Sequence, residues 1–181
     1  MRVIGGTLGG RRLPGRVAAG TRPTGDRVRE ALFSILGPVD GEAVLDLFAG
    51  TGALGIEALS RGAGRAVFVD RDRAAVRAIR ANLEALGLGP ERAQVRPVEA
   101  GRALQDAALR RESYDLVLLD PPYEPAPGLR AMLAERLPPV LAPGARVVAE
   151  RGRRSPPALE LPLTLLTERR YGDTLLTIHQ A

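Results

Sequence analysis

The chain has 181 residues, of which 45% are hydrophobic and 26% are charged, a composition that can bury a core and that excludes wholesale disorder. No apolar run approaches the roughly 20 residues of a membrane-spanning helix, and the first six residues contain no apolar leader. The absence of cysteine excludes disulfides, thiolate nucleophiles and cysteine-based zinc sites. With only one histidine as well, we expect no transition-metal site built from protein side chains. We therefore expect one cytoplasmic domain over residues 1–181, with no membrane contact and no metal.

The charge of the chain is uneven. All 26 basic residues are arginine, which a bias in composition explains, but their placement is more informative. Residues 1–25 contain five arginines and no acid, whereas residues 41–150 contain 14 arginines and 15 acids. A basic arm on a nearly neutral body suits a polyanion, because neutralising phosphates releases counterions. The pattern predicts that residues 1–24 form an arm that faces nucleic acid, although a solvated tail would have the same composition.

The order of the expected elements predicts an α/β fold. Two short runs, 1–4 and 11–14, flank a glycine-rich stretch and indicate a small N-terminal β-hairpin extension. Short apolar runs then alternate with amphipathic helical segments, which is typical of a doubly wound, mostly parallel Rossmann-like sheet covered on both faces. Pro97 places the third strand near an edge, and the chain closes with an antiparallel C-terminal hairpin. We expect helices at 25–36, 53–61, 72–86 and 129–137, strands at 43–48, 65–70, 94–98, 114–119 and 145–149, and the closing hairpin at 159–169 and 173–179.

A glycine motif follows the first strand of the sheet. Gly50, Gly52 and Gly55 match the dinucleotide-binding spacing, and Asp70 ends the next strand twenty residues after Gly50. Glycine lets the backbone approach a ligand closely, and an acid at the end of the second strand can bind ribose hydroxyls. The segment therefore indicates a cofactor that contains a nucleoside.

Two further features favour S-adenosylmethionine over a nicotinamide dinucleotide. Asp46 ends the first strand just before the glycine turn, where an anion suits an ammonium group and opposes a pyrophosphate. The sequence Asp-Pro-Pro-Tyr at 120–123 ends the fourth strand, which opens on the same crevice. The Asp120 carboxylate and the Pro121 carbonyl can accept the two N–H groups of an exocyclic amine, and Tyr123 offers a face on which a base can stack. These residues predict methyl transfer to an amine on a nucleobase.

Five blocks of the chain resemble the bacterial small-subunit ribosomal RNA guanine-N2 methyltransferases. They are MRVIGG at 1–6, TRPTGDRVREALFSIL at 21–36, DLFAGTGALGIEALSRGA at 46–63, DPPY at 120–123 and YGDT at 171–174. The resemblance implies a class I methyltransferase fold, S-adenosylmethionine as the donor and one guanine of small-subunit ribosomal RNA as the acceptor. Whether that RNA is naked or lies within a partly or fully assembled subunit stays open. It also implies a set of site residues: Asp46, Ala49, Gly50 and Gly52 at the methionine end of the cofactor, Asp70 at the ribose, Glu99 at the adenine, Asp120, Pro121 and Tyr123 at the target amine, Arg22 and Thr24 near the catalytic mouth, and Arg11, Arg12 and Arg16 on the RNA backbone.

Three other functions stay open at this stage. An amino-methyltransferase acting on a DNA adenine or cytosine, or on a protein amide, would also use DPPY. The glycine motif alone permits an NAD-dependent oxidoreductase, which Asp46 and DPPY oppose. A non-catalytic RNA-binding module for ribosome assembly would keep the fold. We expect a monomer, because no amphipathic stretch indicates a partner.

Overall fold

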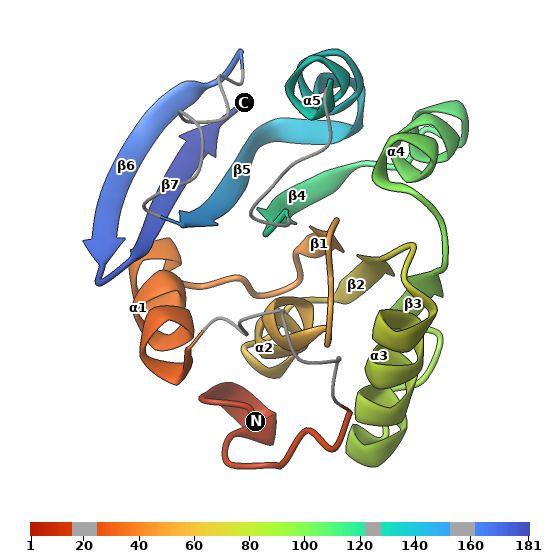
Figure 1. The fold of residues 1–181 in the computed structure, drawn as a ribbon, viewed down its shortest axis with the longest axis vertical. Coiled ribbons are helices and arrows are strands. Elements are labelled where there is room, and N and C mark those ends of the chain that lie inside the picture. The colour runs from red at the N-terminus through yellow and green to blue at the C-terminus, as the bar shows by residue number, and fades with distance from the viewer. Residues whose placement is uncertain (16–24, 122–127, 153–161) are drawn as a thin grey trace.

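The computed structural model describes residues 1–15, 25–121, 128–152 and 162–181, and these contain a seven-stranded mixed sheet between two layers of helices (Figure 1). The strand order is β3-β2-β1-β4-β5-β7-β6, in which the first five strands are parallel and β7 is antiparallel to both of its neighbours. The elements are α1 (Asp26–Leu36), β1 (Ala43–Asp46), α2 (Ala53–Ser60), β2 (Arg65–Val69), α3 (Arg73–Leu86), β3 (Ala93–Arg96), α4 (Ala100–Leu109), β4 (Tyr114–Leu119), α5 (Leu129–Arg136), β5 (Leu141–Gly152), β6 (Thr164–Tyr171) and β7 (Thr174–Gln180), with short 3-10 turns η1 (Gly6–Leu8) and η2 (Pro138–Val140).

The two faces of the sheet bury separate apolar clusters. Helices α1, α2 and α3 cover one face, and α4 and α5 cover the other (Figure 1). In β4, Leu116 and Leu118 belong to the first cluster, whereas Val117 and Leu119 belong to the second, because successive side chains of a strand point to opposite faces. The nearly continuous apolar sequence of β4 follows from this double burial. No helix in the described ranges is long and apolar enough to cross a membrane.

The predicted fold class is confirmed, and several bounds differ. Strand β4 has the expected ends, and β3 lies at the edge of the sheet, with Pro97 just beyond its last residue. Strand β5 begins four residues earlier and ends three later than expected, because it pairs with both β4 and β7. The sequence interpretation missed α4. Its buried stripe consists of Ala103, Leu104 and Ala107, and small side chains give a weak periodic signal.

The N-terminal segment doubles back on itself without forming the expected strands. A single antiparallel bridge joins Arg2 and Arg12, and the Val3 N–H donates to the Arg11 carbonyl at 3.0 Å. The glycine-rich stretch between them forms the 3-10 turn η1 rather than a tight hairpin turn. Val3 and Leu13 are buried in the first apolar cluster. The predicted N-terminal hairpin is therefore present as a short antiparallel pairing, whose ladder is limited because glycine-rich runs hold a strand register weakly.

Candidate active site

The acidic residues of the predicted site lie at the carboxyl edge of the sheet. In the parallel register Asp46 of β1 faces Phe68 of β2 and Leu118 of β4, so Asp70 and Asp120 each lie two residues beyond a neighbour of Asp46. The strand order reverses between β1 and β4, and ligands of open α/β sheets bind at such a switch point. The structure thus brings three acids, at or just beyond the ends of three adjacent strands, to one edge of the sheet beside the switch point.

The turn after β1 presents its backbone to that crevice. Gly50 and Gly52 have φ values of +56° and +78°, in the left-handed region where a side chain is strained. The Gly52 N–H donates to the Ala49 carbonyl, and the Ala49 N–H donates to the Val69 carbonyl at 3.0 Å, which fixes the turn against β2. A Cβ on Gly50 would meet no atom within 4 Å. The turn therefore has open space beside its backbone, which a closely bound ligand can use.

Asp46 is a buried carboxylate whose negative charge receives little stabilisation from surrounding protein groups. Its side chain is 2% exposed, and its Oδ2 accepts the Gly55 N–H at 3.0 Å. Burial raises the pKa of Asp46 to about 7; the Gly55 hydrogen bond lowers it, and the nearby charge of Asp70 raises it further. A carboxylate in this position gains from an added cation. The residue therefore fits the ammonium group that the sequence interpretation assigned to it.

Asp70 and Glu99 occupy different environments at the same edge. The Asp70 carboxylate accepts the N–H groups of Gly50 and Asp72, both at 2.9 Å, so it holds the glycine turn to the end of β2. A carboxylate has about four acceptor positions, which leaves capacity for ribose hydroxyls. The Glu99 side chain is 70% exposed and forms an ion pair of 3.0 Å with Arg71. An adenine beside Glu99 would therefore also contact the Arg71 guanidinium.

The second half of the predicted site is described in part. Asp120 and Pro121 follow β4 directly, on the opposite side of the switch point from the glycine turn. The predicted residues Arg16, Arg22, Thr24 and Tyr123 lie outside the described residues.

The predicted RNA-binding arginines of the arm differ in their surroundings. Arg11 donates to the carbonyls of Ala85 (2.7 Å) and Leu86 (3.1 Å). These carbonyls lie at the C-terminal end of α3, where the last turn of a helix offers acceptors without intrahelical partners. Arg12 is exposed. Arg11 therefore fixes the arm to the body of the protein, whichever further contacts it makes.

A buried glutamate that the sequence interpretation missed anchors the arm. Glu57 of α2 is 0% exposed, and it accepts the N–H groups of Ile4 and Gly5, each at 2.8 Å. Arg61 donates to the same carboxylate at 2.8 Å. All eight residues of α2 are buried, because the arm covers the side that the sheet does not. The available signal was an acid within the apolar run ALGIEALS.

A second missed residue joins the arm to the glycine turn. Asn82 of α3 is fully buried; its Oδ1 accepts the Gly15 N–H at 2.7 Å, and its Nδ2 donates to the Thr51 carbonyl at 2.8 Å. One side chain therefore holds the last described residue of the arm and the turn that faces the crevice. The sequence signal for Asn82 was a side-chain amide on the otherwise apolar face of an amphipathic helix.

Three features together define the fold of the class I methyltransferases: the reversal of strand order, the glycine turn that follows an acidic residue, and the antiparallel strand β7. The hypothetical protein TTHA0928 of Thermus thermophilus is similar over 100% of this chain and 99% of that chain, with a TM-score of 0.82 and 32% identity. Among curated relatives, YlbH of Bacillus subtilis (strain 168) is 42% identical over 180 residues, which are 98% of this chain and 91% of that protein.

The family follows from two further matches. The profile of the family described as conserved hypothetical protein 95 matches residues 1–180. Ribosomal RNA small subunit methyltransferase D of Haemophilus influenzae is 34% identical over 183 residues, which are 99% of this chain and 93% of that protein. The chain belongs to this family, and the predicted membership is confirmed.

Proposed function

We propose that this chain transfers a methyl group from S-adenosylmethionine to the exocyclic N2 amine of one guanine in small-subunit ribosomal RNA. The class of reaction rests on the family, whose relatives carry the name of a ribosomal RNA methyltransferase. The observation that carries the proposal is the pairing of the glycine turn with Asp120 and Pro121 across the switch point. In this arrangement the glycine turn would hold the methyl donor, and Asp120 and Pro121 would hold the amine acceptor.

The cofactor is held by residues on β1 and β2. Asp46 would take the ammonium group, and Ala49, Gly50 and Gly52 would line the methionine end through their backbone. Asp70 would bind ribose hydroxyls, and Glu99 would lie beside the adenine. When bound, S-adenosylmethionine supplies an electrophilic methyl group.

The acceptor amine is held by residues after β4. An exocyclic amine on a purine is a weak nucleophile, because its lone pair is delocalised into the ring. The Asp120 carboxylate and the Pro121 carbonyl would accept its two N–H groups, which favours a pyramidal nitrogen and the positive charge that develops there. As the new N–C bond forms and the S–C bond breaks, the nitrogen becomes cationic, and its proton then leaves to Asp120 or to water. Tyr123 would stack on the base.

The experiment is a labelled-methyl transfer assay on unmethylated small-subunit particles and on their purified RNA, followed by nucleoside analysis. We expect N2-methylguanosine, and the better of the two substrates identifies the acceptor state. A labelled product other than N2-methylguanosine would refute the assignment of atom and base.

The role of Asp120 is tested by substitution. We expect Asp120→Ala to lower transfer at least a hundredfold while leaving S-adenosylmethionine affinity within about threefold of the wild type, since removal of one preorganised hydrogen-bonding group costs about 10²–10³ in rate. Asp40→Ala removes an exposed carboxylate ahead of β1, at the opposite edge of the sheet, and serves as the matched control. Equal turnover of Asp120→Ala and the control would contradict the proposed role.

A further inference from the structure

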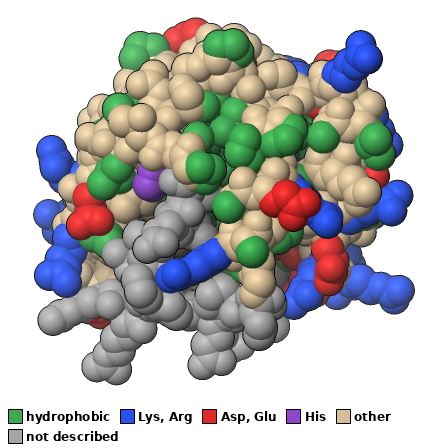
Figure 2. All heavy atoms as spheres, turned by 90° about the horizontal axis from the view of Figure 1, so that it is seen from above, with side chains coloured by type: hydrophobic (Ala, Val, Ile, Leu, Met, Phe, Trp, Pro, Cys, Tyr) green, Lys and Arg blue, Asp and Glu red, His purple; other side chains and the backbone are tan. Residues whose placement is uncertain are grey.

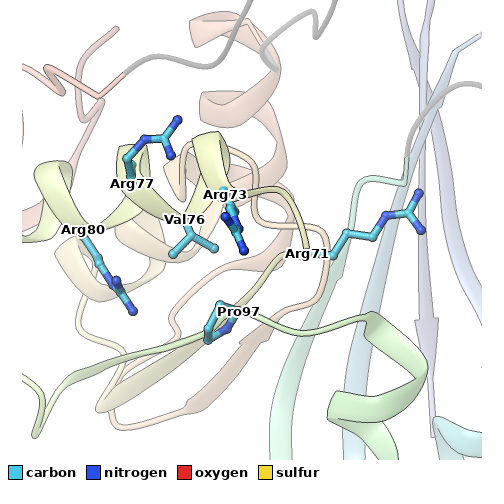
Figure 3. Close-up of a pocket in the computed structure, with 6 residues that line it drawn as sticks. All are labelled: Arg71, Arg73, Val76, Arg77, Arg80 and Pro97. Atoms are coloured by element: carbon cyan, nitrogen blue, oxygen red, sulfur yellow. The ribbon is translucent and has the colours of Figure 1, made fainter.

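Helix α3 carries three arginines on its exposed side. Arg73, Arg77 and Arg80 are spaced by four and three residues, which places them along one face of the helix, and all three are exposed. They line a hollow of about 450 Å³ together with Arg71, Val76 and Pro97 (Figure 3). In this view Arg73 and Arg80 extend toward Pro97, whereas Arg77 extends away from it. We call Arg73, Arg77 and Arg80 the arginine row.

The arginine row differs from most arginines of the described residues in having no protein partner. Within those residues, no hydrogen bond or ion pair involves Arg73, Arg77 or Arg80. Ion pairs with carboxylates are formed instead by Arg2, Arg29, Arg61, Arg71, Arg96, Arg102, Arg110 and Arg146.

The row also concentrates like charges. Arg77 has Arg73 four residues before it and Arg80 three residues after it, a spacing at which like charges weaken a helix. Two acids lie close to the row in the sequence. Asp72 caps the helix through the Ala74 N–H at 2.7 Å. Glu84 stands four residues after Arg80, but within the described residues neither acid forms an ion pair with the row.

The face over α4 and α5 lacks this concentration of one charge. On the face over α4 and α5, hydrophobic side chains gather in the middle, and basic and acidic side chains lie toward the margins (Figure 2). A single-sign row on a rigid helix attracts a partner with a regular array of negative charges.

We propose that the arginine row binds backbone phosphates of the ribosomal RNA substrate, as a contact in addition to the N-terminal arm. This inference rests on the proposed function. A guanidinium binds phosphate bidentately, and a rise of about 1.5 Å per residue separates successive members of the row by about 6 and 4.5 Å along the axis. Such spacing suits neighbouring phosphates of one strand.

The position of the arm supports the same partner. Arg11 binds the end of α3, and Gly15 binds Asn82 of the same helix. The arm and the arginine row are therefore attached to one rigid element, so a single structured RNA can contact both.

The test compares two triple variants with the same change in net charge. The row variant carries Arg73→Gln, Arg77→Gln and Arg80→Gln. The control variant carries the same substitution at Arg110, Arg111 and Arg170, which are exposed on other elements. Affinity for purified small-subunit ribosomal RNA is measured between 50 and 200 mM salt, with S-adenosylmethionine affinity and melting temperature measured in parallel. Each lost phosphate contact lowers the slope of log K against log salt by about 0.7–0.9.

We expect the row variant to lower that slope by about 2 and to weaken binding at least tenfold, while the control variant changes the slope by less than about 0.7. Equal weakening of the two variants, or wild-type binding by the row variant, would overturn the inference. Should the row variant melt early, the single variant Arg77→Gln is used, with an expected loss of about one unit of slope at most. Selective loss of RNA binding in a protein that makes no N2-methylguanosine would refute the proposed function and leave the inference standing. A wild type without salt-dependent binding to the purified RNA would refute the inference, and the methyl-transfer assay on particles would decide the proposed function separately.

Discussion

Replacing Glu57 by Gln is the sharpest test of how the N-terminal arm is held. The carboxylate is 0% exposed and receives three donors at 2.8 Å: the N–H groups of Ile4 and Gly5 and the Nε of Arg61. The amide of Glu57→Gln has one oxygen, which can keep the Gly5 and Arg61 bonds on Oε1. Its NH₂ group then faces the Ile4 N–H, so that two hydrogen-bond donors oppose each other with no acceptor between them.

The expected loss follows from these contacts. An unsatisfied buried N–H costs about 1–3 kcal/mol, and two bonds that change from charged to neutral acceptors lose about 1 kcal/mol each. The free energy of unfolding should fall by about 4 kcal/mol. For a chain of this size, a loss of 1 kcal/mol lowers the melting temperature by about 2–4 °C, so we expect a decrease of roughly 8–16 °C.

The assay is thermal unfolding followed by circular dichroism, with hydrogen exchange at the Ile4 and Gly5 amides as a local readout. Glu30→Gln changes an exposed residue of α1 in the same chemical way and should shift the melting temperature by less than about 2 °C. A Glu57→Gln variant that melts with the control, and whose two amides exchange no faster, would refute the anchoring argument.

Two further predictions concern the crevice. Burial raises the pKa of Asp46 to about 7 in the folded protein, against about 3.9 in the unfolded chain. The native state therefore binds the carboxyl proton of Asp46 more tightly than the unfolded state does, and this contribution to stability is lost as the pH rises through 7. The cofactor-free wild type should lose up to about 4 kcal/mol between pH 4 and 8 that Asp46→Asn does not lose, and parallel pH dependences of the two melting temperatures would contradict this. Replacing Asn82 by Leu leaves the Gly15 N–H and the Thr51 carbonyl without partners and should cost about 2–4 kcal/mol. A calorimetric comparison in which Asn82→Leu is as stable as the wild type would show that neither bond matters.

The fold was predictable where hydrophobic periodicity is strong. The apolar run of β4 and the amphipathic pattern of α3 marked these elements to within one residue. Helix α4 was missed, because a stripe of small side chains differs little in hydrophobicity from the rest of the helix. The pairing of the two N-terminal runs was predictable, but the 3-10 turn between them was not, because short apolar runs do not indicate how glycine-rich backbone turns.

The candidate site was predictable to a different degree. Asp46 and Asp70 could be placed, because the ends of parallel strands must meet at one edge of the sheet. Glu57 and Asn82 could not be assigned a role, because their partners are backbone groups of segments far away in the sequence. A polar residue on an apolar helix face indicates a buried hydrogen bond, but it does not identify the group to which that residue bonds.

The anchoring of the arm also orders events during synthesis. Residues 4 and 5 bind Glu57, and residues 11 and 15 bind the second half of α3, so each contact spans between 52 and 75 residues. At about 5–20 residues per second, the arm waits roughly 3–15 s after its own synthesis before its docking partners exist. Until then α2 lacks the cover that buries its outer side. The part of the first apolar cluster that Val3 and Leu13 contribute therefore forms only after α2 and α3 have been made.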